Sequence, residues 1–143
     1  LPGIIDIVLD LCKEARLPAM RAPRAPLFAG DFGGVGQLIG RTGLAVLARR
    51  AAAKAKRRGI RVPDHFAGIV AGDTATLTRI AANLRDGTTE VMLHPGTDNA
   101  VLIRASFWEH DFEAELAAVC APAVQDALAA SGAAIESFRA LAD

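Results

Sequence analysis

The stretch on which the fold prediction depends is Thr89-Glu90-Val91-Met92-Leu93-His94-Pro95-Gly96 (residues 89–96). Residues 90–93 have the apolar character of a short buried strand, and the Pro-Gly pair that follows takes the backbone out of the sheet. A side chain at the carboxyl end of a strand is where α/β proteins place catalytic groups. The stretch therefore predicts that His94 faces a cleft, where an imidazole that titrates near neutral pH can donate a proton.

Helices and strands are predicted to alternate on both sides of this stretch. Apolar spacing and end signals predict helices over residues 3–15, 36–58, 74–85 and 107–119, and another that starts at Pro122. Strands are predicted at residues 17–21, 66–70, 90–93 and 134–138, with loops at 27–36 and 97–106. Alternation of this kind is typical of a parallel sheet with right-handed crossovers. Because four strands are few for a complete barrel, we expect the C-terminal part of a single (β/α) barrel domain over residues 1–143.

Size and composition limit the function classes. The chain has 143 residues, 52% of them hydrophobic, which is enough for a packed core. Sixteen basic and sixteen acidic residues cancel and aromatic residues are few, so nucleic acid is not an expected partner. The chain begins Leu1-Pro2-Gly3 without an initiator methionine, and we expect part of the catalytic machinery to lie upstream.

Two further side chains are candidates for the site of His94. Arg21 ends the predicted strand at residues 17–21 and could orient a carboxylate through a bidentate pair; a surface arginine is the alternative. Asp64 lies just before the strand at residues 66–70 and could hold His94 in one tautomer; a turn residue is the alternative.

Metal binding finds little support in the sequence. The three histidines, His65, His94 and His110, show neither HxH nor HExxH spacing. His110 is predicted to be solvated on the helix at residues 107–119. We therefore expect no metal ligands in this chain.

Basic residues crowd the end of the helix at residues 36–58. The default interpretation is a solvated face that complements the helix dipole, and the sharper one is contact with anionic headgroups or a phosphorylated substrate. The residues are Arg49, Arg50, Lys54, Lys56, Arg57 and Arg58.

Four segments together resemble a known family. They are AMRAPR (19–24), RVPDHFAGIVAG (61–72), GTTEVMLHPG (87–96) and FEAELAAVCAPAVQDALAASGAAIESFRAL (112–141). The chain resembles the YdjC/ChbG-like carbohydrate deacetylases over nearly its whole length. The RVPDHFAG stretch and the basic helix before it are most similar to the hopanoid-biosynthesis-associated, HpnK-like branch.

The resemblance implies metal-dependent hydrolysis of the N-acetyl group of an amino sugar on a barrel of the deacetylase type. It implies that His94 is the general acid. Analogy with polysaccharide deacetylases at large implies that Arg21 orients the base and that Asp64 tunes His94. The family's Asp-Asp and HxH motifs, which hold the divalent ion (Mg or Zn) and supply the base, are not in this sequence. We expect them upstream, and we expect this piece alone to be inactive.

The branch points to a glycosylated hopanoid lipid as substrate. We expect a cytoplasmic location, and the basic helix end suggests peripheral membrane contact through residues 49–58. The alternative is a non-catalytic interaction or dimerisation module, a homodimer included, whose exposed sheet edges are covered by a partner.

Overall fold

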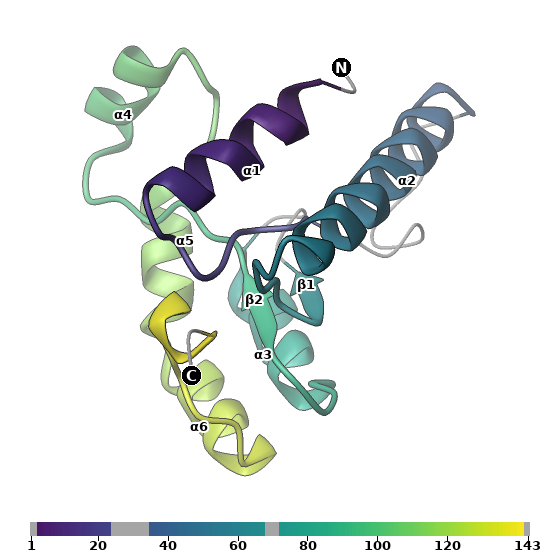
Figure 1. Ribbon diagram of the computed structural model, residues 1–143. Coiled ribbons are helices and arrows are strands. Elements are labelled where there is room, and N and C mark those ends of the chain that lie inside the picture. Colours follow the sequence, from purple (N-terminus) through teal and green to yellow (C-terminus); the bar gives the residue numbers. More distant parts are fainter. Residues whose placement is uncertain (1–2, 24–34, 68–71, 142–143) are drawn as a thin grey trace. The chain divides into compact units, whose positions relative to one another are not determined.

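The computed structural model of the protein describes residues 3–23, 35–67 and 72–141 (Figure 1). The chain forms two compact units. Unit 1 comprises Leu1–Phe66, Gly87–Glu90 and Ile135–Asp143, and unit 2 comprises Ala67–Asp86 and Val91–Ala134. The predicted glycine-rich loop at residues 27–36 lies almost wholly outside the described residues.

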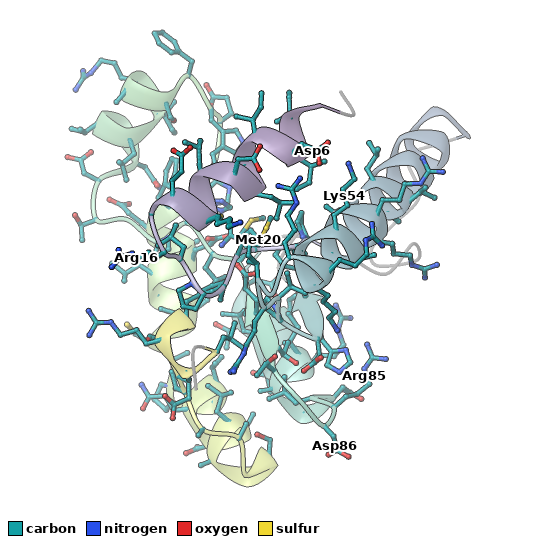
Figure 2. The ribbon with its side chains drawn as sticks, viewed as in Figure 1. Asp6, Arg16, Met20, Lys54, Arg85 and Asp86 are labelled. Atoms are coloured by element: carbon teal, nitrogen blue, oxygen red, sulfur yellow. The ribbon has the colours of Figure 1, made fainter. Side chains whose placement is uncertain are left out.

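Unit 1 is built on α1 (Ile4–Glu14) and α2 (Val35–Arg57), which agree with the helices predicted at 3–15 and 36–58. The apolar side of α1 packs on small residues of α2, and the shared core contains Leu9, Cys12, Ala22, Ala52, Ala55, Ile60 and Val62. Beside this core, Lys54 Nζ lies 2.8 Å from Asp6 (Figure 2) and Arg58 Nη1 lies 2.5 Å from Asp10. Gly59 follows α2 with φ +74°, the left-handed conformation that glycine adopts without strain.

The sheet consists of two parallel strands, β1 (His65–Ala67) and β2 (Thr89–Val91), drawn side by side in Figure 1. In unit 1 the His65 N–H donates to the carbonyl of Thr88 at 2.9 Å. In unit 2 the Met92 N–H donates to the carbonyl of Ala67, also at 2.9 Å. Each strand overlaps a predicted strand, at 66–70 and 90–93, but begins one residue earlier. Residues 68–71 lie outside the described part.

Two predicted strands are corrected. Residues 17–21 contribute only a single parallel bridge, between Ala19 and Arg61. Residues 134–138 form no strand; they are exposed and lead into a 3-10 helix at Phe138–Leu141. A strand needs a neighbouring edge to complete its hydrogen bonds, and these segments lack an extended ladder in the described residues.

Unit 2 packs α3 (Thr74–Ala82) against α5 (Phe112–Val119) and α6 (Pro122–Ser131). Its core contains Leu77, Ala118 and Val124, with Ile80, Leu93, Ala121 and Leu128 against them. As predicted, Asp73 caps α3, and its carboxylate accepts the Thr76 N–H at 2.7 Å.

The segment between β2 and α5 differs from its prediction. Residues 97–106 were expected to be a loop, but α4 spans Asn99–Ser106, because Asp98 caps it by accepting the Val101 N–H at 2.9 Å. Residues 107–111 were expected to be helical. Instead Phe107 ends α4 with φ 54°, and α5 begins only after its own cap, Asp111.

The observed architecture is thus mixed α/β with a parallel strand pair, and both the complete barrel and the single domain over residues 1–143 remain predictions. Within the described ranges, no helix combines the length and apolar character needed to cross a bilayer.

Candidate active site

His94 lies just beyond the sheet in unit 2. β2 ends at Val91, three residues before the histidine, and the Met92 N–H extends the pairing by one residue. The side chain of His94 is 36% exposed. The imidazole is therefore placed near a strand end, as predicted, with one third of its surface open to solvent.

The turn after His94 is held against the start of α5. The Gly96 N–H donates to the carbonyl of Phe112 at 3.0 Å. A Cβ at Gly96 would lie 2.2 Å from Leu102 Cδ1 and 3.0 Å from Phe112 Cβ, while the backbone φ is not in the left-handed region. Glycine is required here because of the close approach of its neighbours.

Glu115 of α5 is the carboxylate beside His94. One of its oxygens, Oε2, accepts the backbone N–H of His94 at 2.5 Å and lies 3.9 Å from Nδ1 of the imidazole. The Glu115 side chain is 7% exposed. The hydrogen bond fixes the backbone at His94, and if the imidazole is protonated, the two side chains form an ion pair at 3.9 Å.

A reciprocal hydrogen-bond network fixes the start of α5 and with it Glu115. Asp111 accepts the Ala114 N–H at 2.9 Å and the Asn99 side-chain amide at 2.8 Å. In return the Asn99 side-chain oxygen accepts the Glu113 N–H at 3.1 Å. The bond from Asn99, followed by that from Ala114, holds the pKa of the Asp111 carboxyl below its usual range.

His110 completes the surroundings of Glu115. Its Nε2 lies 3.3 Å from Glu115 Oε1, and its side chain is 17% exposed. The ring stacks on Trp108 with centroids 4.2 Å apart, and Trp108 also meets His94 edge-on at 4.9 Å. The prediction of a solvated, helical His110 is wrong on both counts, because the residue precedes α5 and is enclosed by aromatic rings.

His94, His110 and Glu115 form what we call the histidine–carboxylate cluster. One possible ligand atom from each lies within 4.8 Å of the other two. The sequence did not predict this cluster, which offers a possible metal site within the chain. Two imidazoles and one carboxylate form a donor set that zinc uses at catalytic sites, and His110 Nε2 is buried without a hydrogen-bond partner among the described residues. The residues present therefore fit a divalent transition metal.

Arg21 lies in unit 1 and pairs with a carboxylate. Its Nε contacts Oε1 of Glu90, and its guanidinium lies 5.9 Å from the centre of the Phe66 ring. The Glu90 side chain is 7% exposed, and its Oε2 is buried without a hydrogen-bond partner among the described residues. The sequence left two interpretations of Arg21 open, orientation of a carboxylate and a surface arginine, and it did not identify Glu90.

Asp64 also lies in unit 1, next to the start of β1. Its carboxylate accepts both the backbone N–H and the hydroxyl of Thr88, each at 3.1 Å. The backbone bond from Thr88 is the main cause that lowers the pKa of Asp64, against a smaller opposing effect of burial. The carboxylate that contacts His94 within unit 2 is Glu115, and the role of Asp64 as a partner of His94 remains a prediction.

Sequence reasoning missed Glu115, although a signal was present. The buried residues of α5 are Phe112, Glu115 and Ala118, which lie three apart. An acidic residue on the buried stripe of a short helix indicates a specific partner, because an unpaired carboxylate is costly to bury. For His110 the signal was its position between two aromatic residues in the sequence, Trp108 and Phe112, whose rings contact the imidazole in the structure.

Comparison with known proteins defines the class. The model of the YdjC-like protein family matches residues 1–130. The chain therefore belongs to the YdjC-like family, whose members are metal-dependent hydrolases of the carbohydrate deacetylase type. No curated protein and no solved structure matches the chain significantly. The match is to the family as a whole, so a particular branch or substrate is a separate proposal.

Proposed function

We propose that this chain carries the proton-donating side of a carbohydrate N-deacetylase, with His94 as the general acid. The single observation behind this role is the contact of Glu115 with both the backbone and the ring of His94. A buried carboxylate that orients an imidazole at Nδ1 leaves Nε2 for the substrate. Membership of the YdjC-like family supports the class of reaction.

The chemistry explains why an acid is needed. Water adds to the acetyl carbonyl, and the tetrahedral intermediate then breaks its C–N bond. Nitrogen leaves poorly as an anion, so it must receive a proton as the bond breaks, and a positioned imidazolium supplies it. The chemistry that a divalent metal contributes when bound is polarisation of the acetyl carbonyl and activation of the water.

Arg21 and Asp64 are proposed to assist this reaction. Arg21 would orient a catalytic carboxylate, and its pairing with the buried Glu90 supports a carboxylate-holding role. Asp64 would tune His94; its support is the hydrogen bonding to Thr88 that keeps its carboxylate ionised. The metal of the family's reaction would be held by the family's Asp-Asp and HxH motifs.

The proposed substrate is an N-acetylated amino sugar on a lipid, such as a glycosylated hopanoid. Support comes from the basic end of α2. Lys54 and Arg58 pair with Asp6 and Asp10 of α1, while the remaining cations of that end are exposed: Arg49, Arg50, Lys56 and Arg57. These four side chains are available to anionic headgroups, with the enzyme at the membrane surface.

A second candidate function, an interaction or dimerisation module, is favoured by α1. Ile4, Ile7 and Leu11 lie at helical spacing and are 53%, 60% and 56% exposed. An apolar stripe of this kind is a potential contact surface for a second copy. Sedimentation of the chain with Ile7→Lys against the unchanged chain tests this alternative, which predicts dissociation to a monomer.

The test of the enzymatic proposal compares leaving groups in the protein at its natural length. His94→Asn should lower acetate release from an N-acetylated amino sugar by about 10²- to 10⁴-fold. The loss should be much smaller for an activated anilide, whose nitrogen leaves without full protonation. His65→Asn is the matched control. An equal loss on both substrates would reduce His94 to a structural role, and full activity of His94→Asn would exclude the proposal.

A further inference from the structure

We infer that unit 2 binds one transition-metal ion of the zinc class, with His94, His110 and Glu115 as its ligands. This goes beyond the proposed function, in which His94 acts by giving up a proton. All three side chains belong to the same unit. His94 comes from the segment after β2, while His110 and Glu115 come from residues 110–115 at the start of α5.

The spacing of the cluster is somewhat wider than that of an occupied tetrahedral site, with one ligand atom from each side chain within 4.8 Å of the other two. Metal bonds of about 2.0–2.2 Å at tetrahedral angles place ligand atoms roughly 3.4 Å apart. Glu115 Oε1 lies 3.3 Å from His110 Nε2, and Glu115 Oε2 lies 3.9 Å from His94 Nδ1. One ion between the three side chains would need only small side-chain rotations.

Burial gives an independent reason for a ligand. His110 Nε2 lies 3.3 Å from Glu115 Oε1 but is buried without a hydrogen-bond partner among the described residues, and the Glu115 side chain is itself only 7% exposed. A buried polar atom without a partner is costly, and a coordinated cation would satisfy both it and the carboxylate. Two imidazole nitrogens favour zinc and its neighbours, since magnesium prefers an all-oxygen shell.

The surroundings already hold the ligands in place. The His94 N–H donates to Glu115, and the rings of Trp108 and Phe112 pack on His110 at 4.2 and 4.8 Å. Contacts of this kind orient metal ligands. Three protein ligands leave a fourth position, and the partial exposure of His94 allows water to occupy it.

A metal ion bound at the cluster should affect catalysis, and this consequence rests on the proposed function of His94. A metal on Nδ1 takes the place of the proton on that nitrogen, so the ring keeps only its Nε2 proton and is no longer an imidazolium, the form that donates a proton readily. Zinc in this site should therefore inhibit deacetylation by removing the imidazolium form of His94, even when the reaction metal is held elsewhere.

Trp108 makes binding directly measurable. It is the only tryptophan of a chain without tyrosine, and its ring contacts both histidines of the cluster. Micromolar zinc or cobalt should change its fluorescence and saturate at one ion per chain by calorimetry. Cobalt should also develop the visible absorption of a four-coordinate site. Millimolar magnesium should do neither. An unaltered signal with zinc and cobalt would overturn the inference.

The variants identify the ligands without an activity assay. His110→Ala and Glu115→Gln should each weaken zinc binding by more than about tenfold, and His65→Ala should leave it unchanged. Wild-type affinity in both cluster variants would overturn the site. If His110→Ala does not fold by circular dichroism, Glu115→Gln and the cobalt spectrum of the unchanged chain decide. Zinc binding that persists while the leaving-group test fails would reject only the proposed function of His94.

Discussion

A single oxygen of Glu115 accepts the backbone N–H of His94 at 2.5 Å and lies 3.9 Å from Nδ1 of the same residue's imidazole. One buried carboxylate on α5 therefore contacts both the backbone after β2 and the imidazole ring. The other oxygen, Oε1, lies 3.3 Å from Nε2 of His110, so this one side chain contacts both histidines of the cluster.

The first prediction concerns the stability that Glu115 provides. Glu115→Ala leaves the His94 N–H without its acceptor and should lower the free energy of unfolding by about 2–4 kcal/mol. Glu115→Gln keeps an acceptor and should cost less than half as much. Urea unfolding measures both, with the exposed Glu109→Ala as the control. Equal losses for alanine and glutamine would show that the acceptor is not what matters.

A second prediction concerns the space behind Glu115. A Cβ at Gly72 would lie 2.8 Å from Glu115 Oε1 and 2.8 Å from Leu93 Cδ2. Gly72→Ala should therefore displace the carboxylate, at a cost of about 1–3 kcal/mol. It should also weaken zinc binding. Gly3→Ala is the control, since nothing lies within 4 Å of the added methyl there. Wild-type stability of Gly72→Ala would contradict the described packing.

The third prediction treats Arg21 and Glu90 as a pair. Arg21→Ala leaves the buried Glu90 carboxylate without its cation and should destabilise the protein by about 2–4 kcal/mol. Adding Glu90→Gln to Arg21→Ala should recover part of that loss, because the buried charge is then gone. A double-mutant cycle by denaturant unfolding measures the coupling. Additive effects of the two substitutions would show that the ion pair contributes nothing.

The fourth prediction is a pH dependence from Asp64. Hydrogen bonds from Thr88 lower the pKa of Asp64 from its ordinary value of 3.8. The folded-state pKa is thus below the unfolded one, so the contribution to stability is complete above the unfolded pKa and is lost as pH falls through the folded pKa. Asp64→Asn should be less stable than wild type at neutral pH, and this difference should shrink below about pH 4.

Urea midpoints measured from neutral pH down to about pH 3 follow that difference. The exposed Asp126→Asn is the matched control and should show no such trend. A stability difference between wild type and Asp64→Asn that stays constant with pH would contradict the role of the ionised carboxylate.

The fifth prediction concerns the end of α2. Replacing the exposed Arg49, Lys56 and Arg57 by glutamate should reduce co-sedimentation with anionic liposomes by at least tenfold, and added salt should reproduce the effect in the wild type. Exposed acidic residues elsewhere, such as Glu136 and Asp126 changed to alanine, provide the control. Unchanged liposome association of the glutamate variant would remove the lipid-surface proposal.

Local signals were sufficient for several elements. The helices α1, α2, α3 and α6 agree with the periodicity and end residues that predicted them, because caps such as Asp73 and Gly59 act within one turn. The start of α5 was misplaced since its cap, Asp111, depends on Asn99, which lies 12 residues away. The strand predicted at 134–138 failed because β-propensity cannot indicate whether a partner edge is present.

The sequence by itself determined the family, the position of His94 after a strand, and the turn at Pro95-Gly96, since these depend on motifs and on neighbours along the chain. Only the tertiary structure decided which groups surround the reactive ones. Glu115 reaches His94 across 21 residues and Glu90 reaches Arg21 across 69. Such contacts arise from the packing of whole elements, and a buried carboxylate finds its partner only once that packing has removed water from both.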